Sequence, residues 1–132
     1  MSSKHGPSLV TDLARARGLG ASHTGTEHWW VQRMTSAALL PLSLWFIFSV
    51  ASMAGASYVT VKMWLSSPCN AALMIALVLV MFHHAVSGME VIFEDYIHCK
   101  CAKVATIMAV KFVGALGAIT CTVSVLKLAL GG

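Results

Sequence analysis

Two histidines and an acidic-phenolic pair stand close together in the stretch MFHHAVSGMEVIFEDYIH, residues 81 to 98. The histidines are His83 and His84, and the pair is Asp95 and Tyr96. Neutral imidazole donates a lone pair to a metal such as haem iron. A phenol beside a carboxylate donates a hydrogen bond and sits near a proton supply, which the reduction of a quinone carbonyl requires. The stretch therefore has groups suited to haem ligation and to quinone binding.

Helical spacing separates the two histidines. His84 shares one helix face with Gly88 and Asp95, whereas His83 lies on the adjoining face with Ser87. A glycine one turn away leaves room for a porphyrin, so His84 is the better candidate for a haem ligand. Hydrogen bonding of His84 to another helix remains an alternative of equal weight on spacing alone. If two histidines hold the haem, His83 cannot be the second, because adjacent helical residues diverge by about 100°. The interfacial histidines His23, His28 and His98 lie at the wrong depth, so another chain must supply it.

Three further candidates each have a plainer interpretation. Tyr96 suits a quinone carbonyl but is also typical of an interfacial anchor, and Asp95 could be a solvated helix end. Arg33, in the approach HWWVQRMT, could pair with a haem propionate. It could equally reach the interface without a ligand.

These residues need membrane-spanning helices to position them. The 132-residue chain is 58% hydrophobic and 11% charged, with mean hydropathy +0.78, which is more apolar surface than a small soluble domain buries. Three apolar runs, at about 35–53, 71–93 and 104–130, approach or exceed the roughly 20 residues that a spanning helix requires. We therefore predict an all-α membrane protein with a three-helix domain over 35–130. Midway along the second run, His84 would lie near the middle of the bilayer.

The distribution of Lys and Arg predicts the orientation. Cationic residues concentrate in the N-terminal segment 1–34 and in the loop after the second run, where Lys100 and Lys103 lie. The loop after the first run has only Lys62. The positive-inside rule then places the segment 1–34 on the inner side. No basic and aromatic pattern indicates nucleic acid.

The motifs resemble a known family. RARGLGASHTGTEHWWVQRMTSAALLPL followed by FHHAVSGMEVIFEDYIH is similar to the D-type hydrophobic anchor subunits of succinate dehydrogenase, respiratory complex II. The shared pattern is a G-x-x-H-W/F-W-x-Q-R-x-T lead and an H-x3-G-x6-D-Y core. The resemblance covers about residues 15–98, and the third run only by length and hydrophobicity.

This resemblance implies specific roles. His84 would be an axial ligand of haem b, Tyr96 a hydrogen-bond donor to ubiquinone, Asp95 its acidic neighbour, and Arg33 a contact near the propionates and the quinone. The neighbouring His83 departs from the family pattern. The chain would be a non-catalytic anchor that attaches the flavin and iron-sulfur subunits to the membrane, so that electrons pass from succinate to quinone in the tricarboxylic acid cycle and the respiratory chain.

The resemblance also implies partners and a location. The partners would be a C-type cytochrome b556 anchor subunit, which supplies the second haem ligand and completes a larger helical bundle, the iron-sulfur subunit and the flavoprotein subunit. The expected location is the bacterial inner membrane, with the mitochondrial inner membrane as an alternative. Two other functions remain open: a haem-free structural subunit of another respiratory complex, and a component of a small proton-coupled transporter.

Overall fold

The computed structural model describes Leu13 and residues 23–131, and these residues form helices without any strand. Three long helices, α2 (His23–Ser52), α4 (Pro68–Tyr96) and α5 (Lys100–Ala129), are joined by short connections and one short helix, α3 (Tyr58–Leu65). By length and composition, all three long helices can cross a membrane. The predicted fold class is thus confirmed. Most of the predicted segment 1–34 lies outside the described residues.

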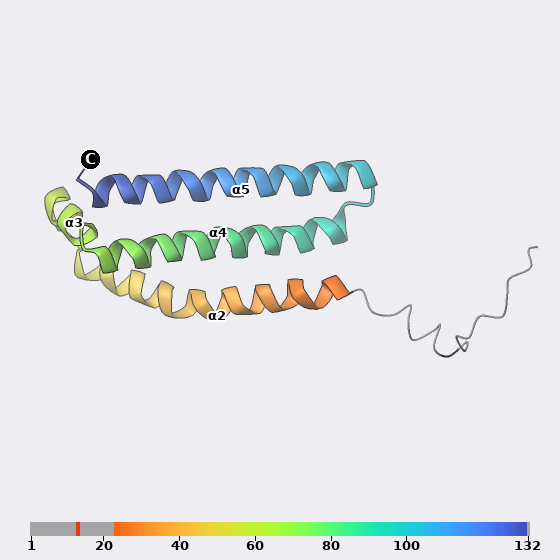
Figure 1. Cartoon of the computed structure of the whole chain (residues 1–132), viewed down its shortest axis with the longest axis horizontal. Helices are drawn as coiled ribbons and strands as arrows, with labels where there is room; N and C mark the ends of the chain where they lie inside the picture. Colours follow the sequence, from red (N-terminus) through yellow and green to blue (C-terminus); the bar gives the residue numbers. More distant parts are fainter. Residues whose placement is uncertain (1–12, 14–22, 132) are drawn as a thin grey trace, which may run out of the picture.

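The three long helices lie side by side in a row with α4 in the middle (Figure 1). Helix α4 packs against both α2 and α5, while α2 and α5 have no contacts with each other within the described residues. Helix α3 lies at the end of the row near the C-terminus and packs against α4 and α5. Because the row does not close, α4 has two faces that neither neighbour covers.

The helix ends have local causes. Pro68 occupies the first turn of α4, where its missing N–H would have no helical partner. The side chain of Ser57 accepts a hydrogen bond from the Thr60 backbone N–H and caps α3. Pro41 lies inside α2, and α2 curves in Figure 1, as expected where a proline removes a helical hydrogen bond.

Few side chains are buried by these contacts. The buried apolar residues are Leu65, Ala71 and Leu77, and no described side chain is fully buried. Large apolar side chains such as Phe48 and Phe112 are exposed along the long helices. A row of exposed apolar helices is expected where lipid or further helices supply the surroundings.

Helices α4 and α5 approach each other closely at two glycines of α5. A Cβ atom added to Gly114 would collide with the side chain of Val86, and one added to Gly117 would come within 2.5 Å of Phe82 Cε1. The absence of a side chain at both positions thus lets α5 approach α4 closely, as small residues do in membrane bundles. This seam between α4 and α5 fixes the register of α5 beside the histidine-bearing helix.

Candidate functional site

His84 lies at the seam between α4 and α2, about half buried. Its Nδ1 atom is 3.0 Å from the hydroxyl oxygen of Thr35 on α2. One turn further along α4, Gly88 faces the amide of Gln32, whose Nε2 would be 3.4 Å from an added Cβ. Thr35 and Gln32, about one turn apart on α2, therefore face His84 and Gly88, about one turn apart on α4. Residues three or four apart lie on the same face of a helix, so the two pairs form one continuous contact.

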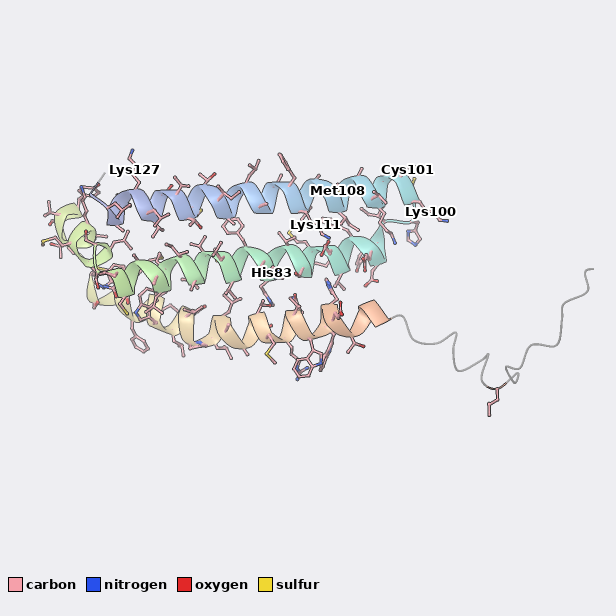
Figure 2. All side chains as sticks on the ribbon, in the orientation of Figure 1. His83, Lys100, Cys101, Met108, Lys111 and Lys127 are labelled. Atoms are coloured by element: carbon pink, nitrogen blue, oxygen red, sulfur yellow. The ribbon has the colours of Figure 1, made fainter. Side chains whose placement is uncertain are left out.

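His83 points elsewhere. It is exposed and lines an open groove of about 700 Å³ that runs across α2, α4 and α5. The groove contains Glu90 of α4, whose carboxylate forms an ion pair with Lys111 of α5. Figure 2 labels His83 and Lys111, the latter with its side chain in the space between α5 and α4. Polar residues on this face of α4 therefore gather away from His84.

The ion pair explains a charge in the spanning part of α4. The side chain of Glu90 is only 12% exposed, whereas that of Lys111 is 55% exposed. Burying a carboxylate without a partner is costly, so Lys111 makes Glu90 tolerable at this depth. Ser87 is also buried beside it, at 6% exposure.

Tyr96 and Asp95 form the last residues of α4. Tyr96 is 78% exposed, and Asp95 is exposed too. Between residues 26 and 131, neither side chain has a hydrogen-bond or ion-pair partner. At 100° per residue, Tyr96 lies on the face of α4 roughly opposite to His83. The structure therefore leaves this end of the helix open to a ligand or to another chain.

Arg33 is exposed on α2, with its guanidinium carbon 5.1 Å from the centre of the Trp29 ring. This distance is within the range of a cation-π contact. Trp29 in turn lies edge-on to Trp30. Arg33 forms no ion pair with Asp95 within the described residues, so the single chain does not bring these two candidates together.

The residues around His84 fit one axial ligand of a haem. Its Nδ1 atom is engaged by Thr35, while its Nε2 atom takes part in no hydrogen bond within the described residues. Gly88, one turn away, presents no side chain. Within the same residues no three His, Cys, Asp or Glu side chains gather as a metal site. The arrangement thus offers one imidazole ligand, and any other ligand to the iron would have to come from outside this chain.

Sequence reasoning missed Thr35, Gln32 and the pairing of Glu90 with Lys111. The first two belong to the lead Q-R-x-T, residues 32–35, and lie about one helical turn apart, as His84 and Gly88 do. The sequence contains both spacings, but pairing Thr35 with His84 and Gln32 with Gly88 required knowing that α2 packs against this face of α4. The ion pair between Glu90 and Lys111 likewise required knowing how α5 is aligned along α4.

Comparisons with known proteins identify the family of the chain. A family model described as the succinate dehydrogenase/fumarate reductase transmembrane subunit matches residues 8–124. A succinate dehydrogenase hydrophobic membrane anchor subunit of Rickettsia bellii is 31% identical over 115 residues, covering 86% of this chain and 91% of that protein. The corresponding subunit of Paracoccus denitrificans is 30% identical over 103 residues, covering 78% of this chain and 80% of that protein.

A further relative has a similar name. The succinate dehydrogenase membrane anchor subunit of Reclinomonas americana is 32% identical over 93 residues, covering 68% of this chain and 78% of that protein. No solved structure matches the chain. The extent of the family match and the coverage of these relatives lead to one conclusion: the chain belongs to the family of succinate dehydrogenase/fumarate reductase transmembrane subunits.

Proposed function

We propose that this chain is the hydrophobic membrane anchor subunit of a succinate:ubiquinone oxidoreductase. Family membership and three apolar helices that can span a membrane support the anchoring role. The observation that carries the proposal further is the placement of His84, oriented by a neighbouring helix and flanked by Gly88, in the middle of α4. The chain attaches the flavoprotein and iron-sulfur subunits to the membrane and contributes to the sites where electrons leave them.

His84 is the residue that would hold haem b, through the imidazole nitrogen that Thr35 leaves free. A bound b-type haem supplies one-electron redox chemistry within the membrane. The polypeptide would position the imidazole through Thr35, with apolar helices around it and Gly88 one turn away. A second anchor chain, the cytochrome b556 subunit, would supply the other histidine ligand.

The exposed end of α4 is the proposed contact with ubiquinone. Tyr96 donates a hydrogen bond from its hydroxyl to a quinone carbonyl, and Asp95 is an acidic neighbour at the boundary between membrane and water. Arg33 contributes positive charge at the same end of the bundle, where it could pair with a haem propionate. The 78% exposure of Tyr96 supports this role, because within residues 26–131 a ligand can approach its hydroxyl without displacing a hydrogen-bond partner.

The chain has no dehydrogenase chemistry of its own in this proposal. Its sequence contains no nucleotide-binding glycine motif, and its four cysteines lack the spacing of an iron-sulfur cluster. Succinate oxidation belongs to the flavoprotein subunit, and electrons reach the quinone through the iron-sulfur subunit. The proposed location is the bacterial inner membrane or its mitochondrial counterpart, with the N-terminal segment inside.

The hydroxyl of Tyr96 provides the test of the quinone role. Tyr96→Phe keeps the ring and removes one hydrogen bond, worth about 0.5–1.5 kcal/mol, or up to about tenfold in rate. The loss is larger if the bond tightens as charge develops on the quinone. We expect succinate-to-quinone turnover of the purified complex to fall several-fold or more. Succinate oxidation by a dye that takes electrons upstream should continue at the wild-type rate.

Tyr58 offers a matched control, since it is the only other tyrosine and lies at the start of α3, at the opposite end of the row. Tyr58→Phe should leave both activities unchanged. Unchanged quinone reduction in an intact Tyr96→Phe complex would show that Tyr96 is only an interfacial anchor. A parallel fall of both activities would also count against the quinone role, because the hydroxyl would then serve assembly.

A further inference from the structure

We propose that Thr35 is a positioning residue for haem ligation: its hydroxyl fixes His84 as the tautomer that is protonated on Nδ1 and has a free lone pair on Nε2. The inference rests on the proposed function, because it concerns how His84 is prepared for iron. It adds a residue on a second helix, and it specifies which nitrogen binds the metal.

The assignment follows from counting protons at Thr35. A hydroxyl has one proton to donate and two lone pairs with which to accept. The Thr35 oxygen lies 2.9 Å from the carbonyl oxygen of Val31 and 3.0 Å from that of Gln32. Threonine hydroxyls in helices commonly bond backbone carbonyls of the preceding turn, so we assign the single hydroxyl proton to this pair of carbonyls. The third partner, His84 Nδ1 at 3.0 Å, must then be the donor.

The tautomer of His84 follows from this direction of donation. A neutral imidazole has one N–H, so a proton on Nδ1 leaves Nε2 as a bare lone pair. That is the form in which histidine binds a metal through Nε2, and in metal sites the other ring nitrogen usually donates to a carbonyl, carboxylate or water. Here the hydroxyl of Thr35, itself bonded to the backbone carbonyls of α2, accepts the hydrogen bond from Nδ1.

The opposite tautomer is disfavoured at this position. With the proton on Nε2, the Nδ1 lone pair would face the lone pairs of Thr35 unless the hydroxyl turned away from the α2 carbonyls. Either change removes a hydrogen bond in a partly buried seam between spanning helices, where water is scarce. The neighbouring contact of Gln32 with Gly88 lies in the same seam and helps to hold the register of the two helices.

Three variants test the role of the hydroxyl in the complete membrane complex. Thr35→Val removes it with little change of shape, whereas Thr35→Ser retains it. Thr120→Val is the matched control, because the Thr120 hydroxyl also bonds a carbonyl one turn back on its helix, Leu116 at 2.8 Å, but lies exposed on α5.

The readouts are haem content per complex and the midpoint potential of the haem that remains bound. Loss of a partner behind a ligating histidine typically weakens metal binding by about 10- to 100-fold. Thr35→Val should therefore show reduced haem content. It should also shift the potential to more positive values, because an imidazole without an acceptor on Nδ1–H is a weaker donor to oxidised iron. Thr35→Ser should resemble the wild type, as should Thr120→Val.

The inference is overturned if Thr35→Val keeps both the wild-type haem content and the wild-type potential. It is also overturned if Thr35→Val prevents assembly of the complex while Thr35→Ala assembles with an unchanged potential, since the hydroxyl would then have no influence on the ligand. Failure of the proposed function looks different. His84→Ala would then leave haem content unchanged, whatever the Thr35 variants do.

Discussion

Adjacent histidines in α4 have different surroundings, although their sequence neighbours are nearly the same. His84 is half buried and bonded to Thr35, whereas His83 is exposed in the groove that contains the Glu90 and Lys111 ion pair. The difference arises because consecutive side chains on a helix diverge by about 100°, so one faces α2 and the other an open face. The preference for His84 as the ligand depends on this geometry and on Gly88.

Substitution of each histidine separates the two roles. His84→Ala should abolish most haem binding, because it removes the lone pair that the iron requires. His83→Ala should keep haem content near that of the wild type, and it serves as the matched control. The measurement is pyridine haemochrome content of the purified complex, expressed per complex. Equal haem content in the two variants would reject the assignment of His84.

The residues of the site differ in how far the sequence could predict them. The type and spacing of His84, Asp95 and Tyr96 were sufficient to propose chemistry. Thr35 could not be assigned in that way, because its role depends on a hydrogen bond across 49 positions of the chain. Side-chain hydroxyls in helices usually bond their own backbone, as Ser36 and Thr120 do here, and nothing local distinguishes Thr35 from them.

The helices were easier to predict than their ends. The three apolar runs led directly to three long helices, because about 20 apolar residues have no other stable conformation in a bilayer. The start of α2 at His23 and the short helix α3 were not expected. Both regions contain polar residues, and hydropathy locates the part of a helix inside the membrane but not its extension beyond the interface.

The close contact between α4 and α5 at Gly114 predicts that a larger side chain there destabilises the protein. Gly114→Ala would place a methyl group against the side chain of Val86, a β-branched residue with little rotamer freedom. We expect a loss of about 1–3 kcal/mol in stability, seen as a lower temperature at which the detergent-purified complex dissociates. The matched rescue is Val86→Ala, which removes the obstructing atoms.

The double variant distinguishes packing from other causes. If Gly114→Ala acts only through contact with Val86, adding Val86→Ala should recover part of the lost stability, and the two effects should not be additive. Additive losses in the double variant would show that this seam does not limit the approach of α5 to α4.

The three-helix row is an incomplete bundle. Large apolar side chains remain exposed on all its long helices, and α4 is covered on two sides only. Lipid can cover some of this surface, but the charged side chains in the groove beside His83 and the open end at Tyr96 are better suited to protein partners. This arrangement agrees with an anchor that works together with a second membrane chain, as the proposed function requires.

The orientation in the membrane leads to a labelling prediction. Cys69 and Cys99 are exposed at the two ends of α4, separated by a helix about 40 Å long. With the N-terminal segment inside, Cys69 should react with an impermeant thiol reagent added to the outer side, and Cys99 only with reagent on the inner side. Variants that each keep a single cysteine, labelled in sealed vesicles of both orientations, provide the measurement. A permeant reagent serves as the control, and the reverse pattern would overturn the orientation.

Purification through an affinity tag on this chain tests the anchoring function most directly. Membranes solubilised in mild detergent should yield one species in which the tagged chain, succinate-dependent ubiquinone reduction and a b-type haem spectrum elute together in constant ratio. This result is expected because the chain is proposed to join the catalytic subunits to the membrane and to the quinone. Recovery of the tagged chain free of succinate dehydrogenase activity, with that activity intact elsewhere in the same membranes, would contradict the proposal.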